Sequence, residues 1–253
     1  MRKTLKRLAM LSGIICLLIP FVYHPNALAG PPPTRKMPKD VKWVRYSVEW
    51  SAIYVSVYRN AWQQVKRRAA NLQEDWAVVL DIDETVLDNS RYQEILFEQQ
   101  KKFPYYWEEW VRKAEAPPVP GVRAFIDSVR SLGEHAHIAY ITNRKSKYQT
   151  ATKENLKKVG LWQEGDVLLC RTDRSDTKGK RRREVMEGTH RCANMGKRKI
   201  IVLVGDQLGD FIDYPKEGNI LQKRSEILTM PEWGTRFFLL PNPMYGSWYF
   251  GYK

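Results

Sequence analysis

Cysteine and histidine are scarce in this chain, and their placement argues against two classes of site. The 253 residues include three cysteines and four histidines. Cys170 and Cys192 have no second cysteine or histidine nearby in the spacing of a zinc site. The histidines are scattered, without an evident serine or cysteine partner, which argues against catalysis built on histidine. The sequence leaves open a disulfide between Cys170 and Cys192, which an oxidising compartment would allow.

A hydrophobic run long enough to span a membrane is also lacking at the N-terminus. Residues 8–23 are mostly apolar but are shorter than the ~20 residues that a spanning helix needs. A basic segment precedes them, and Ala27 and Ala29 are small residues at the positions that a signal peptidase reads. We therefore expect residues 1–29 to be a cleaved signal peptide. The mature protein would be periplasmic or secreted, without stable membrane insertion.

Acidic residues are outnumbered, 28 against 42 basic ones, which gives a formal charge of +14. The leader carries four basic residues, so the mature chain is close to +10 (14 − 4). Such a charge favours anionic partners, including phosphate esters. Eleven lysines and arginines lie within residues 171–199, where we favour a solvated helix face over a dedicated polyanion site. No specific nucleic-acid polymer is expected as a partner, and a homodimer stays open.

The chain after residue 29 has 253 − 29 = 224 residues, enough for one sizeable domain with its own core. The prolines after Gly30 predict an extended tether over residues 30–42. The domain would then occupy residues 43–253.

An apolar run that ends in two aspartates is the most informative feature of the sequence. Residues 76–80 are apolar throughout, and Asp81 and Asp83 follow them. An unbroken run of this kind suits a strand buried on both faces of a parallel sheet. Ligands bind at the carboxyl edge of such sheets, and beyond the strand the chain can turn both aspartates toward one site. Two carboxylates can hold a divalent cation, or one can attack while the other moves protons.

Two later apolar runs, residues 137–141 and 199–204, also end in polar groups. Because the carboxyl ends of parallel strands meet at one edge, these groups should gather beside the aspartate pair. Lys178 lies in the interval between the two runs. The polar residues that follow the runs are Thr142, Asn143, Gly205 and Asp206, with Asp210 one helical turn on.

The remaining patterns predict an α/β fold. Apolar residues at helical spacing predict helices over 43–70, 122–132, 146–159 and from about 178, and further strands are expected at 166–170 and 236–240. Strands that alternate with helices imply right-handed crossovers and a Rossmann-like, mostly parallel sheet flanked by helices. Residues 86–116 are rich in aromatics, show no strand pattern and are too long for a bare loop. We expect them to form a small helical cap.

In their order along the chain, these motifs resemble those of the haloacid dehalogenase superfamily of phosphotransferases. A closer similarity is to the bacterial class C acid phosphatases, which include the lipoprotein acid phosphatase/5′-nucleotidases of Gram-negative outer membranes. It extends from about residue 43 to about residue 250. The segments that carry it are Asp81-Ile-Asp-Glu-Thr-Val-Leu-Asp-Asn-Ser, Tyr140-Ile-Thr-Asn-Arg, Gly205-Asp-Gln-Leu-Gly-Asp-Phe and Leu240-Pro-Asn-Pro-Met-Tyr-Gly-Ser-Trp.

The resemblance implies a reaction and a metal site. Asp81 would be the nucleophile and would form an aspartyl-phosphate. Asp83 would protonate the leaving oxygen and then deprotonate the attacking water. The Asp81 carboxylate, the backbone carbonyl of Asp83 and the Asp206 carboxylate would bind Mg²⁺, since hard oxygen ligands favour this ion. Asp210 would act indirectly, by orienting a water at the metal or Lys178.

The resemblance also implies how the phosphoryl group would be held. Thr142, through its hydroxyl, and Asn143, through its backbone amide, would bind phosphoryl oxygens. Lys178 would neutralise charge, although Lys180 competes for this role. We favour Lys178 because Arg181 follows three residues later, as in the family's pattern, even though one residue is inserted just before Lys178 relative to that pattern.

For the substrate, the resemblance implies that Tyr245 stacks on a nucleobase. Trp107 or Trp110 from the cap could form the opposite wall, and packing within the cap stays open as the alternative. The expected protein is an exported, Mg²⁺-dependent acid phosphatase acting on phosphate monoesters, above all nucleoside 5′-monophosphates. Two alternatives stay open. The first is a phosphatase for non-nucleotide esters, and the second is a non-enzymatic cationic surface or storage protein on the same fold.

Overall fold

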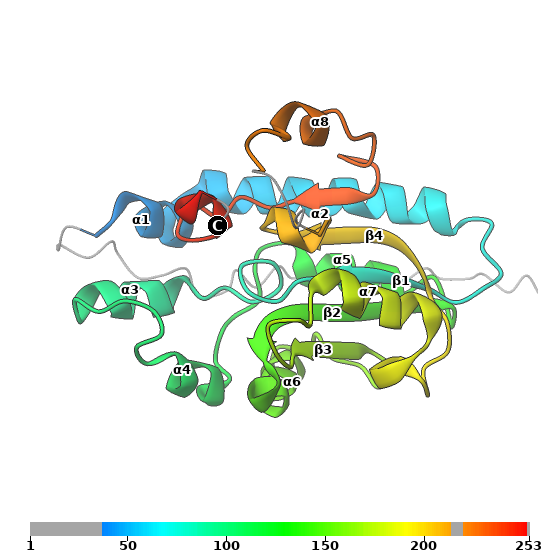
Figure 1. The fold of residues 1–253 in the computed structure, drawn as a ribbon, viewed down its shortest axis with the longest axis horizontal. Helices are drawn as coiled ribbons and strands as arrows, with labels where there is room; N and C mark the ends of the chain where they lie inside the picture. The colour runs from blue at the N-terminus through cyan, green and yellow to red at the C-terminus, as the bar shows by residue number, and fades with distance from the viewer. Residues whose placement is uncertain (1–36, 214–219, 252–253) are drawn as a thin grey trace, which may run out of the picture.

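The fold is built on one parallel sheet. The computed structural model describes residues 37–213 and 220–251, so the expected signal peptide lies outside the described residues. Within them, five strands pair in the order β3-β2-β1-β4-β5, and every pair is parallel (Figure 1). The strands are β1 (Trp76–Leu80), β2 (Ala136–Lys145), β3 (Val167–Arg171), β4 (Lys199–Gly205) and β5 (Phe237–Leu239). The predicted α/β class is confirmed.

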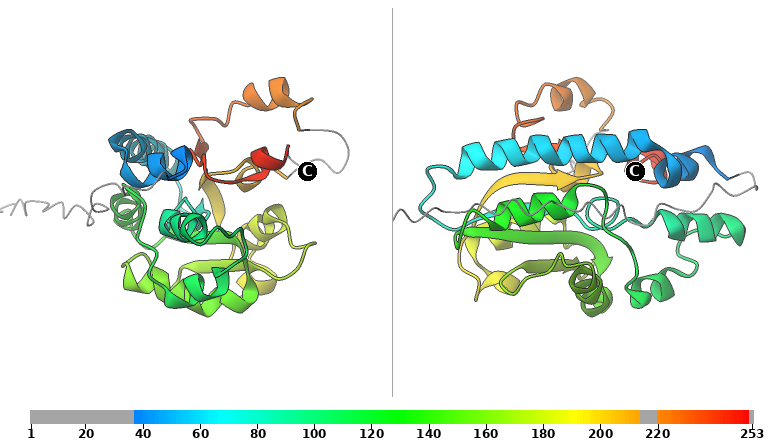
Figure 2. Two further views of the ribbon diagram at one scale, coloured as in Figure 1. Left: turned by 90° about the vertical axis from the view of Figure 1, so that its left-hand side faces the viewer. Right: turned by 180° about the vertical axis from the view of Figure 1, so that it is seen from behind.

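Helices cover both faces of the sheet. The long helix α2 (Val48–Ala69) and α5 (Val122–Arg130) lie on one face and α7 (Lys178–Glu187) lies on the other, as the front view (Figure 1) and the back view (Figure 2, right) show. Val78 and Leu80 of β1 belong to the core cluster that includes α2 and α5, whereas Ala77 and Val79 belong to the cluster under α7. All five residues of β1 are buried, as its unbroken apolar run predicts.

The predicted helix over 43–70 is two helices, because Ser47 starts a new one. The first, α1 (Lys39–Tyr46), ends where Ser47 takes an extended conformation, with φ −84° and ψ 140°. The Ser47 hydroxyl oxygen then accepts the backbone N–H of Trp50 at 3.1 Å, which is an N-cap bond that begins α2. Since α1 begins at Lys39, the predicted boundary between tether and domain falls inside this helix.

Two short helices, α3 (Ser90–Glu98) and α4 (Trp107–Lys113), occupy the segment that was expected to form a cap. They lie beyond the end of the sheet at which the strands terminate (Figure 1). Glu94 of α3 pairs with Arg45 of α1 at 3.1 Å, so α1 and α3 are tied together beside that edge.

The remaining elements complete the framework. Among the described residues, Cys170 and Cys192 are buried free thiols on opposite faces of the sheet, and no helix is long and apolar enough to cross a membrane. The other helices are α6 (Gln149–Lys158) and α8 (Arg224–Leu228), with 3-10 turns at Ser146–Tyr148, His190–Cys192, Leu208–Asp210 and Ser247–Phe250.

Candidate active site

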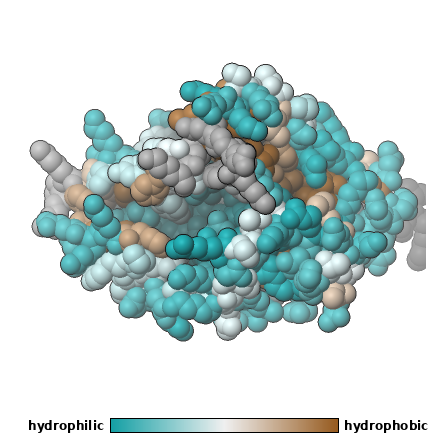
Figure 3. Space-filling model, viewed as in Figure 1, coloured by the Kyte–Doolittle hydropathy of each residue, from teal (hydrophilic) through white to brown (hydrophobic). Residues whose placement is uncertain are grey.

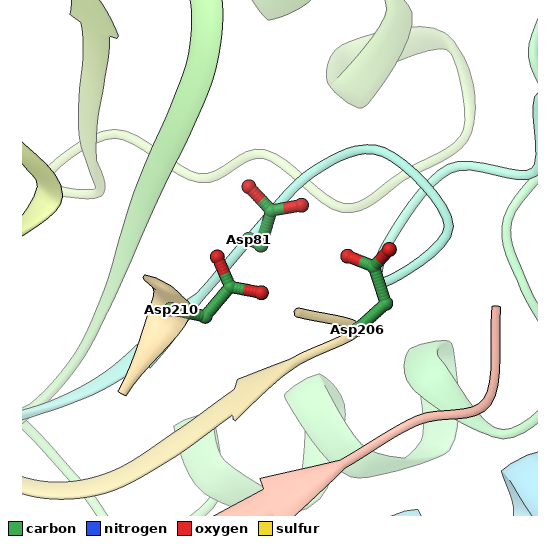
Figure 4. A group of neighbouring side chains, drawn as sticks. All are labelled: Asp81, Asp206 and Asp210. Carbon is green, nitrogen blue, oxygen red and sulfur yellow. The ribbon is translucent and has the colours of Figure 1, made fainter. Parts of the chain in front are cut away.

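Three buried aspartates converge at the carboxyl edge of the sheet. Asp81 follows β1, and Asp206 and Asp210 follow β4, the neighbouring strand. Their carboxyl groups turn toward one another (Figure 4), and one oxygen from each lies within 4.8 Å of the others. The backbone N–H of Asp81 donates to the carbonyl of Val204 at 3.1 Å, which holds the two strand ends in register.

The turn after β4 brings Asp210 under the strand end. Its Oδ2 accepts the backbone N–H of Gln207 at 2.9 Å, and Arg182 donates to its backbone carbonyl at 2.8 Å. A Cβ at Gly205 would overlap the Asp210 carboxylate. Glycine is therefore the residue that lets this carboxylate reach the cluster.

Lys178 supplies the positive charge that faces the three clustered carboxylates. It is the first residue of α7, whose start is capped by the Thr177 side chain accepting the N–H of Lys180 at 3.2 Å. The Lys178 ammonium donates to Asp81 Oδ1 and, at 2.5 Å, to Asp210 Oδ1. The structure thus brings Lys178 to the carboxylates and leaves Lys180 exposed. Asp210 contacts Lys178 directly, an arrangement in which it can orient the lysine.

Burial controls the protonation of these groups. It raises the pKa of Asp81 to about 7, although Lys178 opposes the shift. Burial also raises the pKa of Asp206 well above its ordinary value, and the nearby Asp210 and Asp81 add to the rise. One lysine does not balance three buried carboxylates, so the cluster favours a further positive charge. The donors are all oxygens, and they could hold a divalent cation.

The side chain of Asp83 lies apart from the three clustered carboxylates and pairs with Arg144. Two nitrogens of Arg144 donate to Asp83 Oδ1, at 2.9 and 2.7 Å, and Asn89 Nδ2 donates to the same oxygen at 2.9 Å. Only the backbone carbonyl of Asp83 was expected to bind the metal, so its carboxylate is not needed as a metal ligand. Arg144 is a functional candidate that the sequence did not reveal, although it follows Asn143 directly.

The two residues expected to bind phosphate, Thr142 and Asn143, lie near the end of β2 and differ in burial. The strand continues to Lys145, so Thr142 and Asn143 lie within its last residues and not beyond it. Thr142 is buried, and its hydroxyl oxygen accepts the backbone N–H of Arg144 at 3.1 Å. Asn143 is exposed, and its side-chain oxygen accepts from Arg181 at 2.8 Å.

Arg181 is a second residue whose role sequence reasoning missed. Its position was used only to favour Lys178 over Lys180. Its fully buried guanidinium donates to the backbone carbonyl of Thr142 and, at 3.3 Å, to that of Leu169, and it pairs with Asp176 at 3.3 Å. Arg181 therefore ties α7 to the ends of β2 and β3.

Helix α2 supports the loop after β1 through two tyrosine hydroxyls. Tyr54 donates to the carbonyl of Glu84 at 2.6 Å, and Tyr58 donates to that of Thr85 at 2.5 Å. Glu84, with φ at 55°, accepts the backbone N–H of Asn89 at 2.9 Å, so it caps the following turn. Tyr54 and Tyr58 thus pack in the core and also fix the loop after β1.

Tyr245 and Trp107, two of the aromatic residues expected at the substrate, are connected to the site in different ways. The Trp107 ring lies 5.4 Å from the guanidinium carbon of Arg144, so it is joined to Asp83 through one residue. Tyr245 is half-buried, three residues after Asn242, which donates to Asp206 Oδ2 at 2.8 Å. The space-filling view shows a hollow, mostly hydrophilic in colour, on the face toward the viewer (Figure 3).

Known proteins resemble this chain along nearly all of its length. Residues 24–248 match the family described as HAD superfamily, subfamily IIIB (acid phosphatase). The fold is similar to that of the class C acid phosphatase from Bacillus anthracis, with a TM-score of 0.74 and 31% identity over 85% of this chain and 88% of that one. A structure of that enzyme with tungstate bound gives a TM-score of 0.73 and 30% identity, with the same coverage.

A plant protein is a more distant relative. The stem 31 kDa glycoprotein of Glycine max is 28% identical over 173 residues, which span 66% of this chain and 58% of that protein. The chain therefore matches less than two thirds of that relative's length.

The expected resemblance to class C acid phosphatases is confirmed. The expected enzyme class, a phosphoric monoester hydrolase, is confirmed at the level of the family. The family match spans far more than half of the chain, and it includes every motif residue gathered at the edge of the sheet. On these grounds the chain belongs to subfamily IIIB of the haloacid dehalogenase superfamily, the acid phosphatases.

Proposed function

We propose that this protein is an exported, Mg²⁺-dependent acid phosphatase that hydrolyses nucleoside 5′-monophosphates through an aspartyl-phosphate. The observation that carries the proposal is the buried Asp81 carboxylate at the end of β1, held by Lys178 beside Asp206 and Asp210. The leader-like residues 1–29, which lie outside the described part of the chain, support export.

In the first step, an oxygen of Asp81 attacks the phosphorus of the ester. The bond from phosphorus to the ester oxygen breaks, and its electron pair stays on the leaving oxygen, which takes a proton from Asp83. Lys178 offsets negative charge on the phosphoryl group and on Asp81. The hydroxyl of Thr142 and the backbone amide of Asn143 would hold phosphoryl oxygens. Asp83 is suited to the proton transfer because its carboxylate is not one of the three clustered carboxylates, two of which would bind the metal.

In the second step, water attacks the aspartyl-phosphate and gives a proton to Asp83, and the bond from phosphorus to the Asp81 oxygen breaks. Both aspartates return to their starting states. The carboxylates of Asp81 and Asp206 and the carbonyl of Asp83 would hold Mg²⁺, which would stabilise charge on the phosphoryl oxygens. Asp210 keeps Lys178 in place through the 2.5 Å contact. The tungstate bound by the Bacillus anthracis enzyme supports a site for tetrahedral oxyanions.

Preference for a nucleotide depends on aromatic surfaces at the mouth of the site. Tyr245 follows Asn242, whose contact with Asp206 places this segment beside the carboxylates. Trp107 belongs to α4 and lies against Arg144, on the side of Asp83. A base could stack against either ring, since every nucleobase offers a π face. A phosphatase for non-nucleotide esters would keep the same core residues and lack this dependence on the aromatics.

A substrate panel tests the proposal. Purified protein would be assayed with mononucleotides, sugar phosphates and an aryl phosphate, with and without Mg²⁺. A higher kcat/KM for nucleoside 5′-monophosphates supports the nucleotidase function. Equal or higher values for sugar phosphates would favour the non-nucleotide alternative. Failure to hydrolyse any ester would favour the cationic surface or storage protein.

Tyr245→Ala is expected to lower kcat/KM for a nucleoside 5′-monophosphate by roughly tenfold or more. Loss of one stacking face costs ~1–3 kcal/mol, and ~1.4 kcal/mol is a factor of ten. Hydrolysis of a small ester without a ring should change little. Tyr249→Ala, at an exposed tyrosine four residues later, serves as the control. Parallel losses on both substrates would mean that Tyr245 is a packing residue.

Gly205→Ala is expected to lower activity at limiting Mg²⁺ by ~10–100-fold, the usual effect of disturbing a group that supports a metal site. The new methyl group would displace the Asp210 carboxylate and loosen Lys178. The matched control is Leu239→Ala, since Leu239 is the half-exposed partner of Gly205 in the β4–β5 register. Wild-type kinetics for Gly205→Ala would contradict the role given to Asp210.

A further inference from the structure

The Asp83 carboxylate is held through one of its two oxygens. Oδ1 accepts three N–H groups, two from Arg144 at 2.9 and 2.7 Å and one from Asn89 at 2.9 Å. Among the described residues, the contact of Oδ2 is a single longer one to Arg144 Nε at 3.3 Å. A carboxylate oxygen offers about two lone-pair directions, so Oδ1 is saturated. Oδ2 is therefore the oxygen left available to carry a proton.

The donors to Oδ1 are themselves fixed. The Arg144 side chain is 1% exposed, and its Nη1 donates to Thr152 of α6 at 3.2 Å. Its guanidinium lies against the Trp107 ring at 5.4 Å. The Asn89 side-chain oxygen accepts Trp110 Nε1 at 2.8 Å, which orients the amide with its nitrogen toward Asp83. Two residues of α4, Trp107 and Trp110, thus hold the two residues that hold Asp83.

We propose that Arg144 and Asn89 are positioning residues for Asp83, and that α4 sets their geometry through Trp107 and Trp110. They fix the carboxyl group with Oδ2 toward the reacting atoms. A proton on Oδ2 passes to the leaving oxygen in the first step, and the attacking water returns one to Oδ2 in the second. All three bonds to Oδ1 survive in both protonation states. This inference rests on the proposed function, in which Asp83 is the acid and base.

The effect of losing this support depends on the leaving group. A general acid must lie within hydrogen-bond reach of the atom that it protonates, and a small displacement is costly. An alkoxide is a poor leaving group and needs the proton, whereas a nitrophenolate leaves readily. A fault in the position of Asp83 should therefore slow an alkyl phosphate far more than an aryl phosphate.

The test compares Arg144→Lys and Arg144→Ala on an alkyl and an aryl phosphate. Since general acid catalysis contributes ~10²–10⁴-fold, we expect kcat to fall by about 10–100-fold on the alkyl ester and by about threefold or less on the aryl ester. Trp110→Phe, which keeps a smaller aromatic ring and removes the indole N–H, should show a smaller loss with the same dependence on the leaving group. Arg112→Ala is the control, because Arg112 of α4 pairs with the partly exposed Glu108.

A double-mutant cycle with Asp83→Asn separates positioning from substrate binding. If Arg144 acts through Asp83, then Arg144→Lys should add almost no further loss in the Asp83→Asn background. Equal losses on both esters in both backgrounds, with a raised KM, would show that Arg144 binds substrate and would overturn the proposal. The proposed function fails separately, if Asp83→Asn itself keeps full activity on the alkyl ester. Thermal unfolding of each variant shows which variants are folded. If an Arg144 variant does not fold, Trp110→Phe tests the same geometry in its place.

Discussion

Asp81→Asn is expected to abolish turnover while the protein stays folded. Loss of a nucleophile costs on the order of 10⁴–10⁶ in kcat. The amide keeps the shape of the carboxylate at the end of β1 and removes both the attacking oxygen and one metal ligand. The Lys178 ammonium keeps its contact with Asp210 at 2.5 Å, so the buried lysine is not left without a partner. Removal of one of three crowded carboxylates should not lower the melting temperature by more than a few degrees.

The measurement is kcat on an aryl phosphate, combined with acid quenching to trap phosphorylated protein. Wild-type protein should carry acid-stable phosphate during turnover, and Asp81→Asn should carry none. Asp127→Asn, at an exposed aspartate of α5, is the matched control and should behave as wild type. A folded Asp81→Asn variant that turns over near the wild-type rate would contradict the covalent mechanism.

The sheet and its polar edge could be predicted because they depend on short patterns. The apolar run at residues 76–80 forms β1 with all five side chains buried. Parallel strands bring their carboxyl ends together, so the order of the motifs was enough to gather Asp81 and Asp206, whereas Lys178 was chosen from the family resemblance. This prediction did not need any side-chain geometry.

The support around the site could not be predicted, because it depends on contacts between distant segments. Arg144 and Asp83 are 61 residues apart, and Trp110 and Asn89 are 21 residues apart. Arg144 follows the predicted strand 137–141, where an arginine is usually solvated, and no pattern indicates that this one is buried against Asp83. The break at Ser47 is different, since a serine with an acidic residue two positions later is a common helix start, and the helical spacing of apolar residues over 43–70 obscured it.

Removal of divalent cations is expected to abolish activity, and Mg²⁺ should restore it. Mn²⁺ and Co²⁺ should also restore activity, since the expected ligands are all oxygens: Asp81 and Asp206 through their carboxylates and Asp83 through its carbonyl. Protein treated with EDTA and freed of it by dialysis would be assayed with each ion. Full activity in exhaustively chelated protein would refute the metal requirement.

The requirement for Mg²⁺ should also depend on pH, in a direction that the buried carboxylates fix. Burial raises the pKa of Asp81 to about 7 in the cation-free protein, so this group carries a proton below that pH. Metal binding must then displace the proton, so affinity should weaken as the pH falls, by roughly tenfold per pH unit for one displaced proton. Above pH 7 the Asp81 carboxylate is already ionised, so its proton no longer opposes metal binding. The measurement is the Mg²⁺ concentration that gives half of the full thermal stabilisation, at pH 5, 6 and 8. A value that does not change with pH would mean that Asp81 is ionised before the cation arrives.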